Sequence, residues 1–168
     1  LAYAGHWLIA IDMLGLDGSA YGWMWGTYLV LGMGGQFLLA STFPASKPGA
    51  SSVGNRAERI VWQAAGFALF GYFATLMVKS FVTGSADMDF AYSFAVVFMV
   101  YGVGLITTGA LGESQTLTRA GIAALLLVPV AAWFAGTATS WLLASIGAAL
   151  CVLFPGLVML KNEPKVVE

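Results

Sequence analysis

The chain is a succession of long apolar runs separated by short polar segments. About 20 apolar residues are enough for a helix to cross the hydrocarbon core of a bilayer. We therefore predict an all-α, polytopic transmembrane helix bundle with five complete spans and a partial first span, in a single domain covering residues 1–168. Consecutive spans are expected to pair as three helical hairpins. The approximate ranges are 1–16 (partial), 21–40, 60–78, 90–111, 120–135 and 140–160.

Composition supports a membrane protein and argues against other classes. The 168 residues are 60% hydrophobic and 9% charged, whereas soluble domains carry roughly 25% charged residues. So little charge cannot cover a water-facing surface, so the lipid bilayer is the expected surrounding. With a net charge of −1 and no basic cluster, no nucleic-acid partner is predicted. The chain starts at Leu1 inside an apolar segment, and we expect a natural N-terminus upstream of it.

The polar stretch at residues 41–59 predicts the orientation. It contains Lys47, Arg56 and Arg59, three of the seven cationic side chains. Together with 112–119 and the C-terminal tail it carries six cations, whereas the opposite loops carry only Lys79. Loops rich in Lys and Arg stay in the cytoplasm. Loop 41–59 and the C-terminus are therefore predicted to be cytoplasmic.

The end of this stretch contains signals for a helix start. Asn55 is predicted to be the N-cap of the next helix, with Glu58 three residues later as in a capping box. Arg56 and Arg59 then lie where phospholipid headgroups would be, which favours headgroup anchoring over an anion-binding site. Trp62, close by, is interpreted as an interfacial indole on the cytoplasmic side.

Glycines in span 21–40 are the helix-packing candidates. Gly22 and Gly26 have the spacing of a helix-contact motif, and Gly32 and Gly34 continue the run of small residues. Inside lipid, small residues allow helix backbones to approach closely. Packing within the same chain is favoured here, and a contact with a second chain stays open.

His6 and Asp12 are the weak functional candidates. An ionisable group within a membrane is a candidate for proton transfer, and one helix would carry both residues. The alternative, an interfacial hydrogen bond, is favoured because Asp12 is expected at the outer interface, where water reaches it. With one histidine and one cysteine in the chain, we predict no catalytic residue, cofactor or metal ligand.

A few polar and proline positions lie within the spans. Thr107 and Thr108 are expected to donate to carbonyls of their own helix. Pro129 is expected to kink its span, and Pro155-Gly156 to mark a bend or fraying near the end of the last span.

Three stretches resemble a known group of proteins. GHWLIA at residues 5–10, KPGASSVGNRAERIVW at 47–62 and PGLVMLK at 155–161 are similar to sequences of small, uncharacterised bacterial inner-membrane proteins with about six spans. The resemblance implies a bacterial inner-membrane location and no specific activity.

Three function classes remain. The lack of catalytic groups and the many small residues favour an accessory or scaffold subunit that associates with other membrane proteins. The alternative is a small-solute or ion transporter or channel, which the three-hairpin pattern and Pro129 would suit. An enzyme or cofactor carrier has the least support.

Overall fold

The chain is helical throughout the part that the structure describes. The computed structural model describes residues 2–42, 52–84 and 90–161, and these contain no strand. The all-α prediction is therefore confirmed for them. The elements are α1 (Ala2–Ala10), α2 (Ser19–Thr42), α3 (Val53–Thr83), α5 (Ser93–Leu111), α6 (Gln115–Trp133), α7 (Ala138–Ala148), the π-helical turn η1 (Ala149–Leu153) and α8 (Phe154–Lys161).

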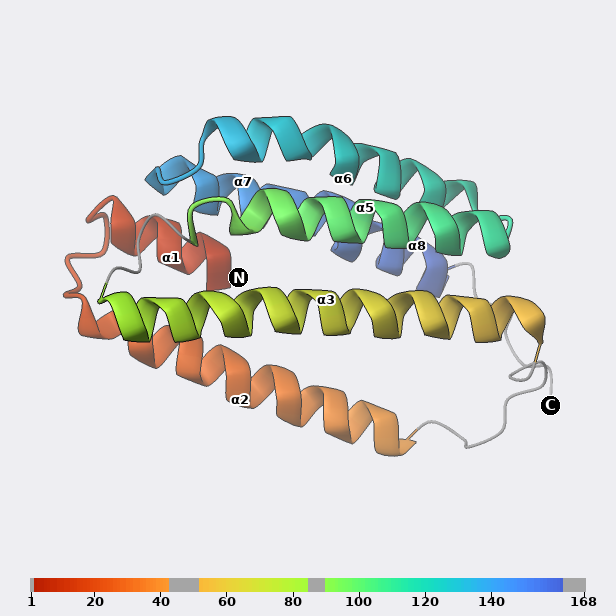
Figure 1. Cartoon of the computed structure of the whole chain (residues 1–168), viewed down its shortest axis with the longest axis horizontal. Coiled ribbons are helices and arrows are strands. Elements are labelled where there is room, and N and C mark those ends of the chain that lie inside the picture. Colours follow the sequence, from red (N-terminus) through yellow and green to blue (C-terminus); the bar gives the residue numbers. More distant parts are fainter. Residues whose placement is uncertain (1, 43–51, 85–89, 162–168) are drawn as a thin grey trace.

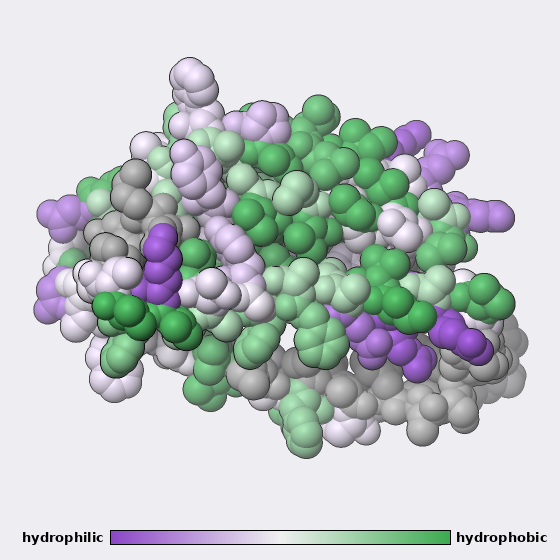
Figure 2. All heavy atoms as spheres, in the orientation of Figure 1, coloured by the Kyte–Doolittle hydropathy of each residue, from purple (hydrophilic) through white to green (hydrophobic). Residues whose placement is uncertain are grey.

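Four stretches among the described residues are long and apolar enough to cross a membrane. They are α3, α5, α6 and the continuous helix Ala138–Met159 formed by α7, η1 and α8. Figure 2 shows apolar side chains along the middle of the molecule and many of the polar ones towards its two ends. These features fit a membrane location. The predicted count of five complete spans and one partial span stays a prediction.

The packed part of the molecule is centred on α5, α6 and the α7–η1 helix (Figure 1). The most extensive contact joins α5 to α6, while α1 packs on α7 and α3 packs on α5. The main contact of α2 is with α1. The closest pair, α5 and α6, belongs to two different predicted hairpins, so the grouping into three hairpins is not established by these contacts.

A very short turn makes α5 and α6 neighbours. Glu113 has a φ of 52°, and the amide of Ser114 donates to the carbonyl of Gly109 at 2.8 Å, the arrangement of a Schellman helix end. The hydroxyl of Ser114 then accepts from the amide of Leu117 at 3.4 Å and caps α6. One helix therefore ends and the next begins within three residues, which forces them to run antiparallel.

Glycines allow the backbones of α5 and α6 to touch. A Cβ added to Gly121 would lie 2.7 Å from the amide nitrogen of Ile106 and 2.8 Å from the carbonyl oxygen of Gly102. A Cβ on Gly109 would lie 2.6 Å from the amide nitrogen of Thr118. Only glycine fits at such a crossing, and this close approach supplies the van der Waals contact that holds helices together in lipid.

The glycines of α2 do not take part in this kind of packing. A Cβ added to Gly22, Gly26, Gly32 or Gly34 would meet no described atom within 4 Å. These four glycines therefore make no close contact with another described helix, and their packing within the chain is not confirmed. The reason is that α2 lies against α1 rather than across another long helix. A contact with a second chain stays a prediction.

The start of α3 also differs from the prediction. Ser52 is the N-cap, and its hydroxyl accepts from the amide of Asn55 at 3.3 Å. The prediction of Asn55 as the N-cap was wrong because Ser52, three residues earlier, caps the first turn. The helix therefore begins at Val53. As a result Arg56 and Arg59 lie on the first two turns of α3, where both side chains are exposed.

Pro155 explains the π-helical turn η1. A proline ring inside a helix clashes with the carbonyl four residues earlier and offers no N–H to it. That carbonyl belongs to Cys151, which lies in η1, and α8 continues through Pro155 to Lys161. A wider turn removes the clash. The helix therefore accommodates the proline by forming a π turn, and it does not fray at this point.

We expect Gly121→Leu to destabilise the monomer by about 1–3 kcal/mol or more, because added bulk must push two backbones apart. Gly26→Leu is the matched control, with open space around it, and should leave the thermal unfolding midpoint of the detergent-solubilised monomer nearly unchanged. Equal losses of stability in the two variants would contradict the packing described.

Candidate functional site

His6 lies in a cluster of aromatic rings built from three helices. Its ring stacks on Trp141 of α7, with centroids 3.5 Å apart and an interplanar angle of 15°. Tyr21 of α2 lies 4.3 Å away, centroid to centroid. The indole N–H of Trp25, also on α2, donates to Nδ1 of His6 at 3.1 Å. His6 is thus a hydrogen-bond acceptor that ties α1 to α2 and α7.

The sequence suggested that one helix carries both His6 and Asp12. In the structure Asp12 lies beyond the end of that helix. Helix α1 ends at Ala10, and Asp12 follows with a φ of 56°. The amide of Asp12 donates to the carbonyl of Ile9, and that of Met13 to the carbonyl of Leu8, both at 3.0 Å. This is again a Schellman helix end, with an aspartate where glycine is usual. Asp12 therefore terminates α1, and the expectation that one helix carries both residues was wrong.

The aromatic cluster continues from His6 towards the middle of the bundle. Tyr3 of α1 makes an edge contact with Phe94 of α5, with centroids 5.6 Å apart. Trp141 packs edge-on against Phe94 at 4.8 Å and lies 6.3 Å from Tyr3. Edge contacts of this kind stabilise by about 0.5–1.5 kcal/mol each beyond area burial. The rings thus connect α1, α2, α5 and α7 at one end of the molecule.

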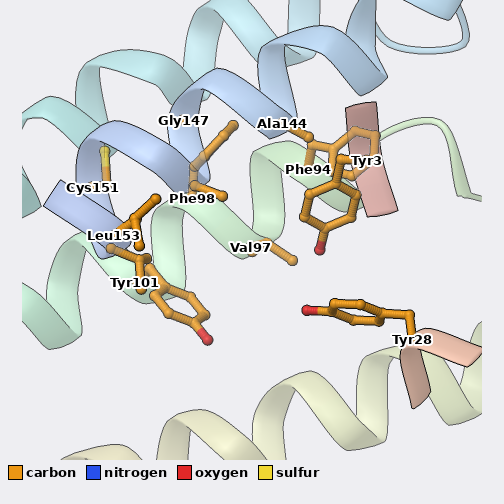
Figure 3. Close-up of a pocket in the computed structure, with 12 residues that line it drawn as sticks. Tyr3, Tyr28, Phe94, Val97, Phe98, Tyr101, Ala144, Gly147, Cys151 and Leu153 are labelled. Carbon is orange, nitrogen blue, oxygen red and sulfur yellow. The ribbon is translucent and has the colours of Figure 1, made fainter. Parts of the chain in front are cut away.

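A cavity of about 290 Å³ opens beside Tyr3 and Phe94. It is bounded by α1, α2, α5, α7 and η1, and its walls are mostly apolar (Figure 3). The described lining residues include no charged side chain. The residues that define its shape and chemistry are Tyr3, Tyr28, Phe94, Phe98, Tyr101 and Cys151.

Three tyrosine hydroxyls turn towards the same space. Tyr3, Tyr28 and Tyr101 come from α1, α2 and α5, and Figure 3 shows their hydroxyls around the empty centre. None of the three hydroxyls forms a hydrogen bond with another residue in the described part of the chain. The cavity therefore offers an apolar wall with several unsatisfied donors, a combination typical of small-molecule sites.

The π turn forms one side of this cavity. Cys151, Val152 and Leu153 of η1 line it, and the thiol of Cys151 is buried. π turns inside α-helices occur frequently at functional sites. Among the described residues, no three His, Cys, Asp or Glu side chains are grouped to hold a metal ion.

Trp62 has a structural role that the sequence did not indicate. Its indole N–H donates to the hydroxyl of Thr108 at 2.9 Å, and its ring packs across Gly104 and against Tyr101. This joins α3 to α5, so Trp62 is a contact between helices, and its place at the interface stays a prediction. Thr107 does donate to the Val103 carbonyl at 2.9 Å, as predicted.

The predicted site residues are thus distributed over several places. His6 lies next to the cavity, Asp12 ends α1, Arg56 and Arg59 lie at the start of α3, and the α2 glycines face away from the described chain. The three tyrosines were missed. A signal for them was available, because phenols within apolar helices need a hydrogen-bond partner.

Comparison with protein-family models, with curated proteins and with solved structures gave no match to the chain. The function must therefore be inferred from the geometry alone.

We expect Trp25→Phe to lower the thermal unfolding midpoint in detergent. The ring contacts are largely kept, but Nδ1 of the half-buried His6 loses its donor, and the net contribution of one hydrogen bond is about 0.5–1.5 kcal/mol. Trp23→Phe is the control, since Trp23 lies on the same helix and its side chain is 79% exposed. A midpoint equal to that of the unaltered protein for Trp25→Phe would show that the hydrogen bond contributes nothing.

Proposed function

We propose that the protein is an accessory or scaffold subunit of a bacterial inner-membrane assembly, with other membrane-protein helices packed against α2 and α3. The observation that supports this most is the uneven packing of the molecule. The apolar segment of α3 has no buried residue, whereas a third of the corresponding segment of α5 is buried.

The surface of α2 adds to this proposal. Its glycines have open space next to them, and glycine offers lipid very little surface for contact. In membranes such positions favour close approach of another helix. A helix of a partner subunit could pack closely on the shallow surface of α2 and contact the exposed side chains of α3.

The proposed orientation places the loop 41–59 and the C-terminus in the cytoplasm. Arg56 and Arg59 near the start of α3, Arg119 near the start of α6 and Lys161 at the end of α8 belong to one end of the bundle (Figure 1). Gly54 lies beside the carbonyl of Leu111, which brings the start of α3 to the end of α5. We propose that Arg56 and Arg59 contact phospholipid headgroups at this end.

The alternative function, a transporter or channel for small solutes or ions, has weaker support. Ion and solute paths through membranes are commonly marked by ionisable side chains within spans. In the four candidate spans, the charged side chains are confined to Lys79 and to the first two turns of α3 and α6.

We expect the double variant Gly22→Leu/Gly26→Leu to lose co-purifying membrane chains after mild-detergent extraction, while the monomer stays folded. Ala110→Leu is the control, since it adds an apolar side chain at an exposed position on α5 and should keep these chains. Chain identification by mass spectrometry measures the outcome. Recovery of the protein alone, with no stoichiometric partner even before substitution, would count against the subunit role.

The orientation has its own test. In a Cys151→Ala background, a membrane-impermeant thiol reagent applied to intact cells should modify Thr83→Cys and spare Ser51→Cys. The six-to-one distribution of cations is the physical reason. Labelling of Ser51→Cys alone would show that the orientation is the opposite of the one proposed.

A further inference from the structure

We propose that the cavity lined by Tyr3, Tyr28 and Tyr101 binds a lipid-soluble molecule whose flat ring head group carries carbonyl acceptors, as a quinone does. This is a binding function in addition to the proposed subunit role and does not depend on it.

The size and walls of the cavity fit a ring. Its volume of about 290 Å³ is near the lower end of the range for ligand pockets, roughly 300–1,000 Å³. Phe94 and Phe98 contribute aromatic surface, and Val97 and Ala144 are small and apolar. A flat ring can stack or pack edge-on against such surface, whereas a charged head group would find no counter-charge among the described lining residues.

The polar groups of the cavity select for acceptors. The three hydroxyls come from separate helices and turn to one space (Figure 3). Polar groups within a membrane that lack partners are costly. Since no described residue satisfies these hydroxyls, carbonyl oxygens on a ligand would receive bonds that the protein itself does not provide.

The position of Tyr28 indicates where such a molecule would enter. Tyr28 is 53% exposed, and it lies on α2, whose main contact is with α1 alone. The other walls of the cavity belong to α1, α5, α7 and η1, and α1 packs on α7. We infer that the head group enters from the lipid past Tyr28 and that the apolar tail of the molecule stays in the lipid.

A binding titration tests this. The full chain in lipid nanodiscs is titrated with decylubiquinone, and quenching of tryptophan fluorescence is followed, because Trp25 and Trp141 both lie near Tyr3. We expect saturable quenching. Tyr28→Phe and Tyr101→Phe should each weaken binding roughly five-fold, the effect of one net hydrogen bond.

Two matched controls make the result specific. Tyr92→Phe removes a phenol that does not line the cavity and is 55% exposed, and it should leave the affinity unchanged. Decylbenzene has a ring and the same chain but no carbonyl, and it should bind at least five-fold more weakly. Should Tyr101→Phe fail to fold, Val152→Trp fills the cavity from a position that is 48% exposed and should abolish saturable quenching.

Three outcomes would overturn the proposal. Quenching that rises linearly without saturation would mean partition into lipid only. Equal affinity for decylbenzene would mean that the hydroxyls recognise nothing. Binding that survives both tyrosine substitutions and the Val152→Trp substitution unchanged would place the ligand elsewhere on the protein.

Discussion

The direct backbone contact between α5 and α6 is the constraint on which the rest of the structure depends. Within lipid there is no hydrophobic force to bring helices together, so close van der Waals contact must do so. Gly102, Gly109 and Gly121 make that contact possible because a side chain at any of them would overlap the opposite helix. The other contacts follow the same rule, since Phe98 packs over Gly147 of α7 and Trp62 packs over Gly104.

The candidate site arises from a chain of local causes. Pro155 requires that the carbonyl of Cys151 be moved away, and the helix responds with the π turn η1. That turn supplies one wall of the cavity, and Phe94 and Tyr101 of α5 supply another. The aromatic cluster around His6 then fixes α1 and α2 at the open end, which brings two further tyrosines to the same space.

The molecule has a packed half and a sparsely packed half. Helices α5, α6, α7 and η1 contain most of the buried apolar residues of the described chain, whereas α3 has none. The small residues of α2 lie in the sparsely packed half. The proposed partner and the proposed ligand would bind at different places. A partner helix would cover the outer surfaces of α2 and α3. A ring head group would occupy the space between Tyr28 and the packed half.

The sequence by itself determined the helical class and the presence of helices that are long and apolar enough to cross a membrane, because these follow from length and hydropathy. The sequence also predicted the bond of Thr107 to its own helix. It did not determine which glycines are packed, since helices that are apolar all round have no polar face to indicate how each is rotated. Tertiary structure decided that Gly121 is crowded and Gly26 is not, that Trp62 binds Thr108, and that His6 meets Trp25 instead of Asp12. These outcomes depend on contacts between residues far apart in the chain, which the local pattern does not encode.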